Sequence, residues 1–207
     1  QQCQELVEHL QAKGISAQAL HGDLEQRDRD QVLTLFANRS LSVLVATDVA
    51  ARGLDIDALD MVINVELARD AEIHVHRVGR TGRAGEKGLA ISLVAPAEGH
   101  RAQAIEDIQK AALRWEQLDN LKAQNGAPLL PTMSTLCIAA GRKDKLRPGD
   151  ILGALTGDAG LPGTQVGKIA IFDFQAFVAV ERAVAKQALQ RLNNGKIKGR
   201  SLRVRIV

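Results

Sequence analysis

Short runs of almost wholly apolar residues constrain the fold of this chain most. Three of them stand out, at residues 42–46 (SVLVA), 61–65 (MVINV) and 89–94 (LAISLV). Segments whose apolar residues recur at helical spacing alternate with these runs, at 1–13, 26–38, 73–78 and 99–112. A strand that is apolar at nearly every position is typical of a parallel sheet buried on both sides. The pattern therefore predicts an α/β domain with a parallel sheet and helices on both faces.

The unusual residues of this first part follow the predicted strands. HGD follows the short apolar segment 15–20, TDVAARGLD follows 42–46, and HRVGRTGRAG follows the helix after 61–65. In parallel sheets, ligands bind in the loops beyond the carboxyl ends of the strands. These loops are therefore the predicted functional site.

Three arginines in the last of these motifs suggest a phosphate ligand. Arg77, Arg80 and Arg83 are spaced by three, so a helical turn would bring them to one side. Planar guanidinium groups suit phosphate because each can donate two hydrogen bonds to its oxygens. For any single arginine, an ion pair with a nearby acid such as Glu72 or Glu86 is the alternative.

The charge of the chain is divided unevenly. Residues 1–132 have a net charge of −5 and residues 133–207 one of +8, within an overall +3. Residues 120–132 contain Gly126, Pro128 and Pro131 without apolar periodicity, as linkers do. We therefore predict a first domain at 1–117, a linker at 118–132 and a second domain at 133–207. The basic domain is expected to meet a polyanion, and a merely solvated face is the alternative.

The second domain is predicted to be a small α+β domain of ferredoxin-like fold. Its predicted strands are residues 133–140, 166–171, 176–180 and 202–207, and its predicted helices are 147–155 and 182–192. The resulting order β-α-β-β-α-β is that of a split βαβ motif. This order alone does not indicate a function, because many unrelated proteins share it.

Basic residues and one aromatic residue are the candidate RNA contacts of this domain: Arg142, Lys143, Lys145, Lys196, Lys198, Arg200, Arg203, Arg205 and Phe177. Few acidic residues offset the basic ones, so ordinary solubilising charge is a weaker explanation. Residues 174–180 (FQAFVAV) resemble the aromatic strand of an RNA recognition motif, but Gln175 and Val180 stand where aromatic residues are expected. Phe177 is expected either to stack on a base or to belong to the core.

Composition disfavours several classes of protein. Cys3 and Cys137 are far apart and lack metal-ligand spacing, which excludes a disulfide scaffold and a zinc finger and suits a reducing cytoplasm. No metal site is expected. No apolar stretch approaches the roughly 20 residues that span a bilayer. Aromatic residues make up only 2%, so binding by base stacking alone is disfavoured.

The motifs of the first part carry a family resemblance. HGD–QRDR, TDVAARGLD and HRVGRTGRAG, in this order and spacing, resemble the second RecA-like domain of DEAD-box RNA helicases over about residues 1–115. The resemblance implies that ATP lies between two RecA-like domains, with Mg²⁺ held by the first, and that single-stranded RNA crosses both.

The resemblance also implies roles for individual residues. Arg80 and Arg83 would be arginine fingers that neutralise charge on the transferring phosphate. Asp55 would contact the ribose, and Gly53 would let its loop come close to it. His76 would join the network between the two RecA-like domains. A second set would contact RNA backbone phosphates: Gly22, Arg29 and Thr47.

The second domain is similar to the C-terminal domain of one bacterial subgroup. Residues 141–163 (GRKDKLRPGDILGALTGDAGLPG), 166–169 (VGKI) and 195–200 (GKIKGR) resemble the DbpA subgroup of DEAD-box proteins. This resemblance implies binding to a hairpin in the peptidyl-transferase region of 23S ribosomal RNA. It further implies a part in assembly of the large ribosomal subunit, and thus pre-50S particles as partners.

Two motifs of an ATPase are not in this sequence. It contains no G-x-x-x-x-G-K-[ST] phosphate loop and no D-E-A-D segment. The resemblance places both in a preceding RecA-like domain, so we expect a piece of a longer enzyme that does not hydrolyse ATP alone. The alternatives are an RNA-binding adaptor with an inactive helicase domain, a DNA-dependent helicase or ATPase, and a stand-alone arginine-rich binding domain. The sequence makes no prediction about self-association.

Overall fold

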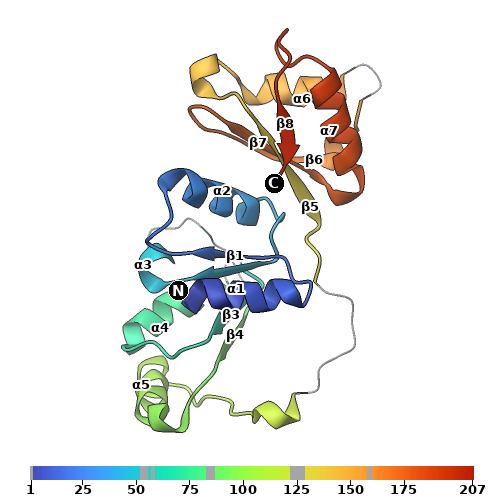
Figure 1. The fold of residues 1–207 in the computed structure, drawn as a ribbon. Coiled ribbons are helices and arrows are strands. Elements are labelled where there is room, and N and C mark those ends of the chain that lie inside the picture. The colour runs from blue at the N-terminus through green and yellow to red at the C-terminus, as the bar shows by residue number, and fades with distance from the viewer. Residues whose placement is uncertain (1, 52–55, 57–58, 83–86, 122–128, 158–159) are drawn as a thin grey trace. The chain divides into compact units, whose positions relative to one another are not determined.

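The computed structural model describes residues 2–51, 56, 59–82, 87–121, 129–157 and 160–207 (Figure 1). Contacts between residues group the chain into two compact units, one of residues 1–52 with 126–207 and one of residues 53–125. The predicted division at a linker over 118–132 stays a prediction. Among the described residues, no helix has both the length and the apolar character needed to cross a membrane.

The first elements of the chain form a parallel pair of strands with helices. Helix α1 (Gln2–Ala12) precedes β1 (Ala17–Leu20), and α2 (Gln26–Ala37) precedes β2 (Val43–Ala46) and the short α3 (Asp48–Ala51). Strand β1 pairs with β2 in parallel, from Ala17 opposite Val43 to Leu20 opposite Ala46. Helix α1 packs on the pair through Val7, which is buried with Ala17 and Ala19. The carboxyl ends of both strands, and the loops that follow them, therefore lie side by side.

The unit of residues 53–125 contains a second parallel pair. Strand β3 (Met61–Asn64) pairs with β4 (Leu89–Ser92), and α4 (Ala71–Val78) lies between them in the chain. Helix α5 (Gly99–Gln109) follows, flanked by 3₁₀ turns at Pro96–Glu98 and Leu118–Asn120. Its core is built around Leu67, Ala102 and Ile105.

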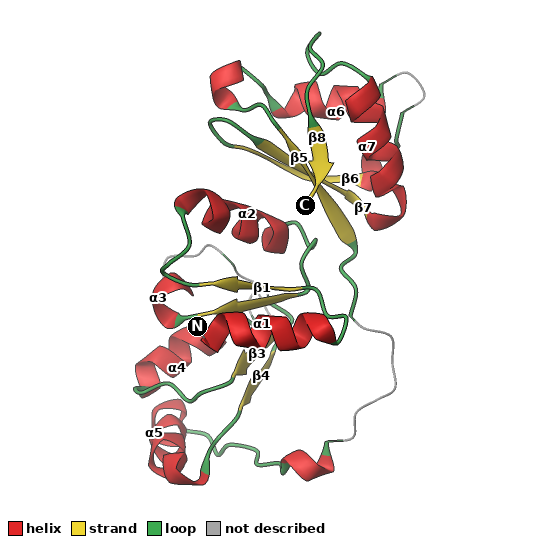
Figure 2. Ribbon diagram, in the orientation of Figure 1, coloured by secondary structure: helices red, strands yellow, loops and turns green. Residues whose placement is uncertain are grey.

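The predicted α/β fold with parallel strands is confirmed, although the strands are arranged as two pairs (Figure 2). Their burial differs from that expected of strands covered on both faces. Met61, Ile63 and Leu89 are 45%, 56% and 49% exposed. The expected burial on both faces is therefore not met at β3 and β4, whereas β1 is buried at Ala17, Ala19 and Leu20.

The chain ends in an antiparallel sheet with two helices, and the predicted β-α-β-β-α-β order is confirmed. The strands are β5 (Met133–Ile138), β6 (Val166–Ile171), β7 (Ala176–Glu181) and β8 (Val204–Ile206). The helices are α6 (Pro148–Thr156) and α7 (Ala185–Asn194), with 3₁₀ turns at Arg142–Asp144, Gly163–Gln165 and Arg182–Val184.

Its strand order in space is β6-β7-β5-β8. One continuous core joins the sheet to both helices. Leu136 and Val178 from the sheet are buried in it with Ile151 and Leu155 of α6 and Leu192 of α7. This region therefore has a packed interior of its own, from which its loops project.

Candidate nucleic-acid and nucleotide site

Of the three residues assigned to RNA phosphates, Gly22 and Thr47 follow β1 and β2, and Arg29 lies in the first turn of α2. Arg29, on α2, donates from Nη2 to the Ala50 carbonyl at 2.7 Å, and the Ala50 amide approaches Thr47 Oγ1 at 3.4 Å. The structure thus brings Arg29 and Thr47 together through α3. Gly22 lies exposed in the loop after β1, where an added Cβ would meet nothing within 4 Å. A ligand could approach its backbone closely.

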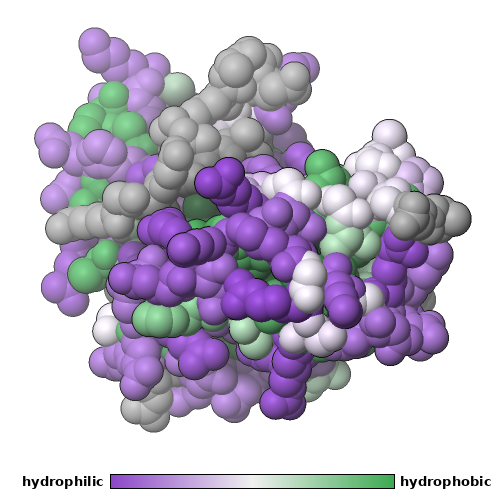
Figure 3. Space-filling model, turned by 90° about the horizontal axis from the view of Figure 1, so that it is seen from above, coloured by the Kyte–Doolittle hydropathy of each residue, from purple (hydrophilic) through white to green (hydrophobic). Residues whose placement is uncertain are grey.

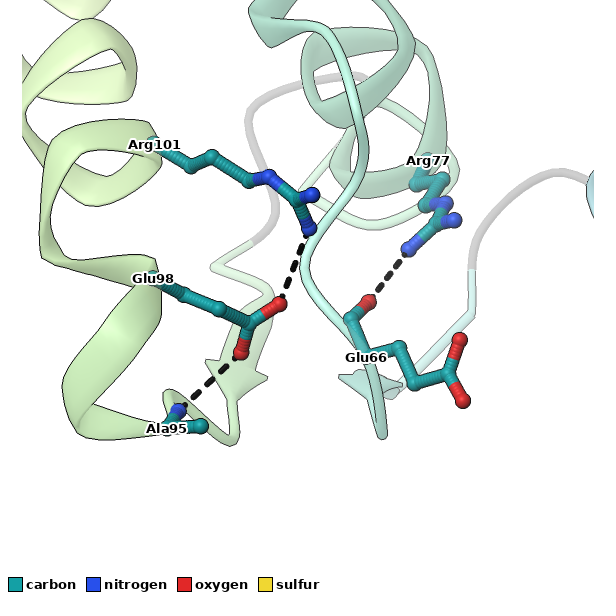
Figure 4. A network of polar contacts seen from close by, with 5 residues as sticks. All are labelled: Glu66, Arg77, Ala95, Glu98 and Arg101. Carbon is teal, nitrogen blue, oxygen red and sulfur yellow. Dashed lines mark hydrogen bonds and ion pairs between the residues drawn. The ribbon is translucent and has the colours of Figure 1, made fainter.

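Helix α4 carries Arg77, the first arginine of the motif, ends at Val78 before Arg80, and is fixed to the end of β3. Asp70 caps the helix by accepting from the Glu72 amide at 2.9 Å. Arg77 donates from Nη1 to Asn64 Oδ1 at 3.2 Å and to the Glu66 carbonyl at 2.8 Å (Figure 4). Arg77 therefore positions α4, and its guanidinium is engaged within the protein.

A second polar network supports the start of α5 in the same unit. Glu98 accepts from the Ala95 amide and pairs with Arg101, both at 3.0 Å (Figure 4). The segment that leaves β4 is thereby connected to the first turns of α5.

Two of the residues assigned to ATP and catalysis lie close in sequence around the end of α4. His76 is exposed in the last turn, and Arg80 follows the helix, its carbonyl accepting from the Leu59 amide at 3.0 Å. A guanidinium at this position fits a nucleotide phosphate chemically. Gly53, Asp55 and Arg83 lie outside the described residues.

Possible metal ligands can be placed only among the residues that the structure describes. Within the described ranges, no three His, Cys, Asp or Glu side chains gather as ligands. The described part of the chain therefore offers no set of side chains suited to Mg²⁺.

His74 lies on the buried side of α4. Burial lowers the pKa of His74 below its ordinary value of 6.5, and the nearby Arg77 guanidinium acts in the same direction. Its Nδ1 is buried without a hydrogen-bond partner in the part of the chain that the structure describes. His74 is therefore kept neutral and belongs to the interior.

Two basic loops of the C-terminal region are joined by hydrogen bonds, and we call residues 142–145 and 196–200 the basic loop pair. Arg200 donates from Nη2 to the Asp144 carbonyl at 2.6 Å, and its Nη1 lies 3.7 Å from the Asp144 carboxylate. Lys198 donates to the Lys145 carbonyl and lies 3.6 Å from the Asp150 carboxylate.

The loop pair forms a shallow open pocket. Its lining combines four cations with one acid: Lys143, Asp144, Lys145, Lys198 and Arg200. Lys145 and Lys198 have left-handed backbone conformations, with φ of 60° and 53°, where each loop turns sharply. Four of the predicted RNA contacts therefore meet at one place, although they come from opposite ends of the domain's sequence.

Lys196, the first residue of the second basic loop, lines a separate shallow pocket with Arg191. Arg203 and Arg205 are both exposed and flank the buried Val204, so they share one face of the β8 segment as predicted. Phe177 is fully buried, and its ring packs edge-to-face on Phe172 with centroids 5.7 Å apart. Of the two expected positions, Phe177 therefore takes the one in the core, and its ring is not accessible to a base.

Cys137 is buried on β5 opposite Arg205. Burial raises the pKa of the Cys137 thiol, while the Arg205 guanidinium acts in the opposite direction. A protonated, buried thiol is a structural side chain with little reactivity.

Comparison with known proteins identifies both regions. Residues 1–85 match the helicase conserved C-terminal domain, and residues 135–206 match the DbpA RNA binding domain. A crystal structure of the Escherichia coli DEAD-box protein SrmB, bound to regulator of ribonuclease activity A, is 35% identical with a TM-score of 0.54. It covers 61% of this chain, which in turn covers 75% of that protein chain. The chain belongs to the DEAD-box family.

Within this family, the chain is similar to DbpA helicases over nearly its whole length. The ATP-dependent RNA helicase DbpA of Escherichia coli (strain K12) is 55% identical over 205 residues, which are 99% of this chain and 44% of that protein. The DbpA of Bacillus subtilis (strain 168) is 32% identical over 220 residues, covering 97% of this chain and 46% of that protein. The chain thus spans somewhat less than half the length of these two relatives.

Sequence reasoning missed the acidic residues that hold the basic loop pair. Asp144 accepts from the Gly141 amide at 3.0 Å, and Asp150 accepts from the Arg147 amide at 2.9 Å. Each acid stands three residues after the group that it caps, a spacing typical of helix starts. That spacing was the available signal, and the same two carboxylates also pair with Arg200 and Lys198.

Proposed function

We propose that the chain is the C-terminal half of an ATP-dependent RNA helicase of DbpA type. In this proposal, the cytoplasmic enzyme binds a hairpin of 23S ribosomal RNA and separates nearby short duplexes during assembly of the large ribosomal subunit, in pre-50S particles. One observation carries it: a helicase C-terminal domain and a DbpA RNA binding domain occur in one chain, and the second presents joined basic loops.

ATP, held between this region and a preceding RecA-like domain that also holds Mg²⁺, would supply the free energy of phosphoryl transfer. Arg80 and Arg83 would neutralise charge on the transferring phosphate, as arginine fingers do. Gly53 and Asp55 would hold the ribose, and His76 would link the two RecA-like domains.

RNA would be bound at two places with different tasks. Gly22, Arg29 and Thr47 would contact backbone phosphates of the strand being separated. The basic loop pair, which includes Lys196, would bind the hairpin together with Arg203 and Arg205, whereas Phe177 is buried in the core. Tethering raises the effective concentration of nearby duplex without adding any contact at the chemical site.

Hairpin binding by residues 1–207 tests this proposal. The probes are a fluorescent 23S hairpin from the peptidyl-transferase region, the same hairpin with a scrambled loop, and its DNA counterpart. We expect the 23S RNA hairpin to bind most tightly, with log K falling by roughly 0.7–0.9 per phosphate contact as log salt rises. Equal affinity for the DNA hairpin would favour a DNA-dependent enzyme. RNA-stimulated ATP hydrolysis by residues 1–207 alone would contradict the assignment of the phosphate loop to a preceding domain.

A further inference from the structure

Phe174, in the turn between β6 and β7, is an aromatic side chain left in solvent. It is 75% exposed, and no large apolar side chain in the described ranges is more exposed. Phe172, two residues earlier, instead packs against Phe177. The face of the molecule in Figure 3 is mainly hydrophilic, with smaller apolar areas between the polar side chains. A single exposed apolar side chain is common on protein surfaces, so the groups around Phe174 decide whether it contacts a partner.

The turn that carries Phe174 is held firmly. Phe172 donates its amide to the Gln175 carbonyl at 2.8 Å, which closes the turn. The turn is also bonded to the first of the basic loops, because the Arg142 amide donates to the Phe172 carbonyl at 2.7 Å. The Lys143 amide likewise donates to the Asp173 carbonyl at 2.9 Å.

Gly141 makes this close approach possible. A Cβ at Gly141 would lie 2.2 Å from the Phe172 carbonyl oxygen, so no other residue fits without displacing the turn. Arg142 adds a side-chain contact, with Nη1 at 3.3 Å from Asp173 Oδ1 and Nη2 at 3.2 Å from the Ile171 carbonyl oxygen. A ring presented by a fixed backbone loses little freedom when it binds a planar partner.

The charges beside Phe174 select the kind of partner. The Arg142 side chain is 72% exposed despite its bonds, and Lys143 is exposed as well. Both belong to the basic loop pair, in a region with a net charge of +8. An aromatic face flanked by cations matches single-stranded nucleic acid, whose bases stack on rings while its phosphates pair with Lys and Arg.

We propose that Phe174 stacks on an unpaired base of the bound RNA, with the phosphates next to that base contacting Arg142 and Lys143. The proposal rests on the proposed function, since RNA must bind this region. It deepens that function by assigning the reading of an unpaired nucleotide to the β6–β7 turn.

Affinity measurements on residues 1–207 test the proposal, with the 23S hairpin and a fully paired duplex of equal length as probes. Phe174→Ala is expected to raise the Kd for the hairpin about 5- to 100-fold, because stacking on an aromatic ring contributes that much per base. The salt dependence should remain, since no phosphate contact is lost. Phe174→Trp should bind about as tightly as the original chain, and Leu152→Ala, at an exposed apolar residue of α6, should bind unchanged.

Phe174→Leu separates stacking from general apolar contact. Leucine keeps the apolar surface but has no aromatic face, so we expect it to bind as weakly as the alanine variant. If Phe174→Leu binds the hairpin as tightly as the original chain, the contact is a general apolar one and the stacking proposal is wrong. An unchanged Kd for Phe174→Ala, or an equal loss on the paired duplex, would overturn it as well.

The two proposals fail in distinguishable ways. If Phe174→Ala binds normally while Lys143→Glu weakens binding, the stacking proposal is wrong and the RNA-binding function stands. If residues 1–207 bind neither hairpin nor duplex, both are wrong.

Discussion

The strands of the C-terminal region and those of the parallel pairs differ in how fully they are buried. Strand β7 is buried continuously from Ala176 to Val180, whereas β3 buries only Asn64 among its four residues. The C-terminal sheet is covered by α6 and α7 in one core, and its loops are fixed on that core. Among the parallel strands, β3 and β4 keep apolar side chains half exposed, whereas β1 is buried at Ala17, Ala19 and Leu20. The comparison shows that the C-terminal helices complete the burial of β7, whereas β3 and β4 leave apolar surface accessible within the described residues.

The largest expected effect concerns ATP turnover and tests whether chemistry belongs to the parallel pairs. In a parent protein that includes the first RecA-like domain, Arg80→Ala should lower RNA-stimulated ATP hydrolysis about 10³- to 10⁵-fold. Hairpin affinity of residues 1–207 should be unchanged by the same substitution, since Arg80 is not part of the basic loop pair. Lys87→Ala, at an exposed cation nearby in the sequence, is the matched control. Turnover that survives Arg80→Ala would contradict its role as an arginine finger.

The second prediction tests the difference in burial directly. Leu136 is fully buried in the C-terminal core, so Leu136→Ala should lower the free energy of unfolding of that region by about 2–5 kcal/mol. Met61→Ala, at a strand residue that is 45% exposed, should lower the stability of its unit by less than about 1 kcal/mol. Amide hydrogen exchange of β5 and β3 in urea measures the two separately. Similar losses of stability in both variants would contradict the difference in burial between β5 and β3.

The elements of the C-terminal region were predictable because local pattern and burial agree there. All four predicted strands are present, but their ends depend on pairing that the sequence does not show. The strand predicted over 133–140 ends at Ile138, and the last strand begins only at Val204, because β8 pairs with β5 from Leu136 to Ile138 alone. In the first part, the sequence located the strands but not their division into two pairs.

The sequence pointed to the basic residues of the candidate site, but not to their arrangement in space. The charge pattern identified the basic residues, but Asp144 and Arg200 are 56 positions apart, and only the fold brings them together. Arg77 shows the opposite case. Its spacing groups it with Arg80, yet Asn64 and the Glu66 carbonyl engage its guanidinium. Which arginine supports the fold and which faces a ligand depends on contacts with distant segments.

The third prediction tests whether the basic loop pair alone provides the anchor. Charge reversal at Lys143 and Lys145 should weaken hairpin binding about tenfold or more and reduce the salt dependence of log K by roughly 0.7 per lost phosphate contact. Lys186→Glu, at an exposed lysine on α7, makes the same change in charge outside the loop pair as either single reversal, Lys143→Glu or Lys145→Glu. Salt titrations of all variants give both quantities. An equal effect of Lys186→Glu would show that total charge, and not the loop geometry, determines affinity.

The smallest expected effect is a pH dependence of the free energy of unfolding, confined to the unit of residues 53–125. Because the pKa of buried His74 lies below its ordinary value of 6.5, the unfolded chain binds more protons than the folded chain in the window just below that pH. The stability that neutral His74 contributes is therefore fully present above pH 6.5 and is lost as the pH falls toward the lowered pKa. Urea unfolding between pH 8 and 5, followed by amide hydrogen exchange of α4, measures this loss.

A comparison of two histidines on one helix assigns the effect. His74→Gln removes the buried titrating group, so the loss of stability in this pH window should disappear. His76→Gln changes an exposed histidine two residues along α4 and should leave the loss in place. If the loss of stability at low pH instead disappeared in His76→Gln, the burial of His74 would not be its cause. If both variants still lose stability as the pH falls, other titratable groups of the unit cause the loss.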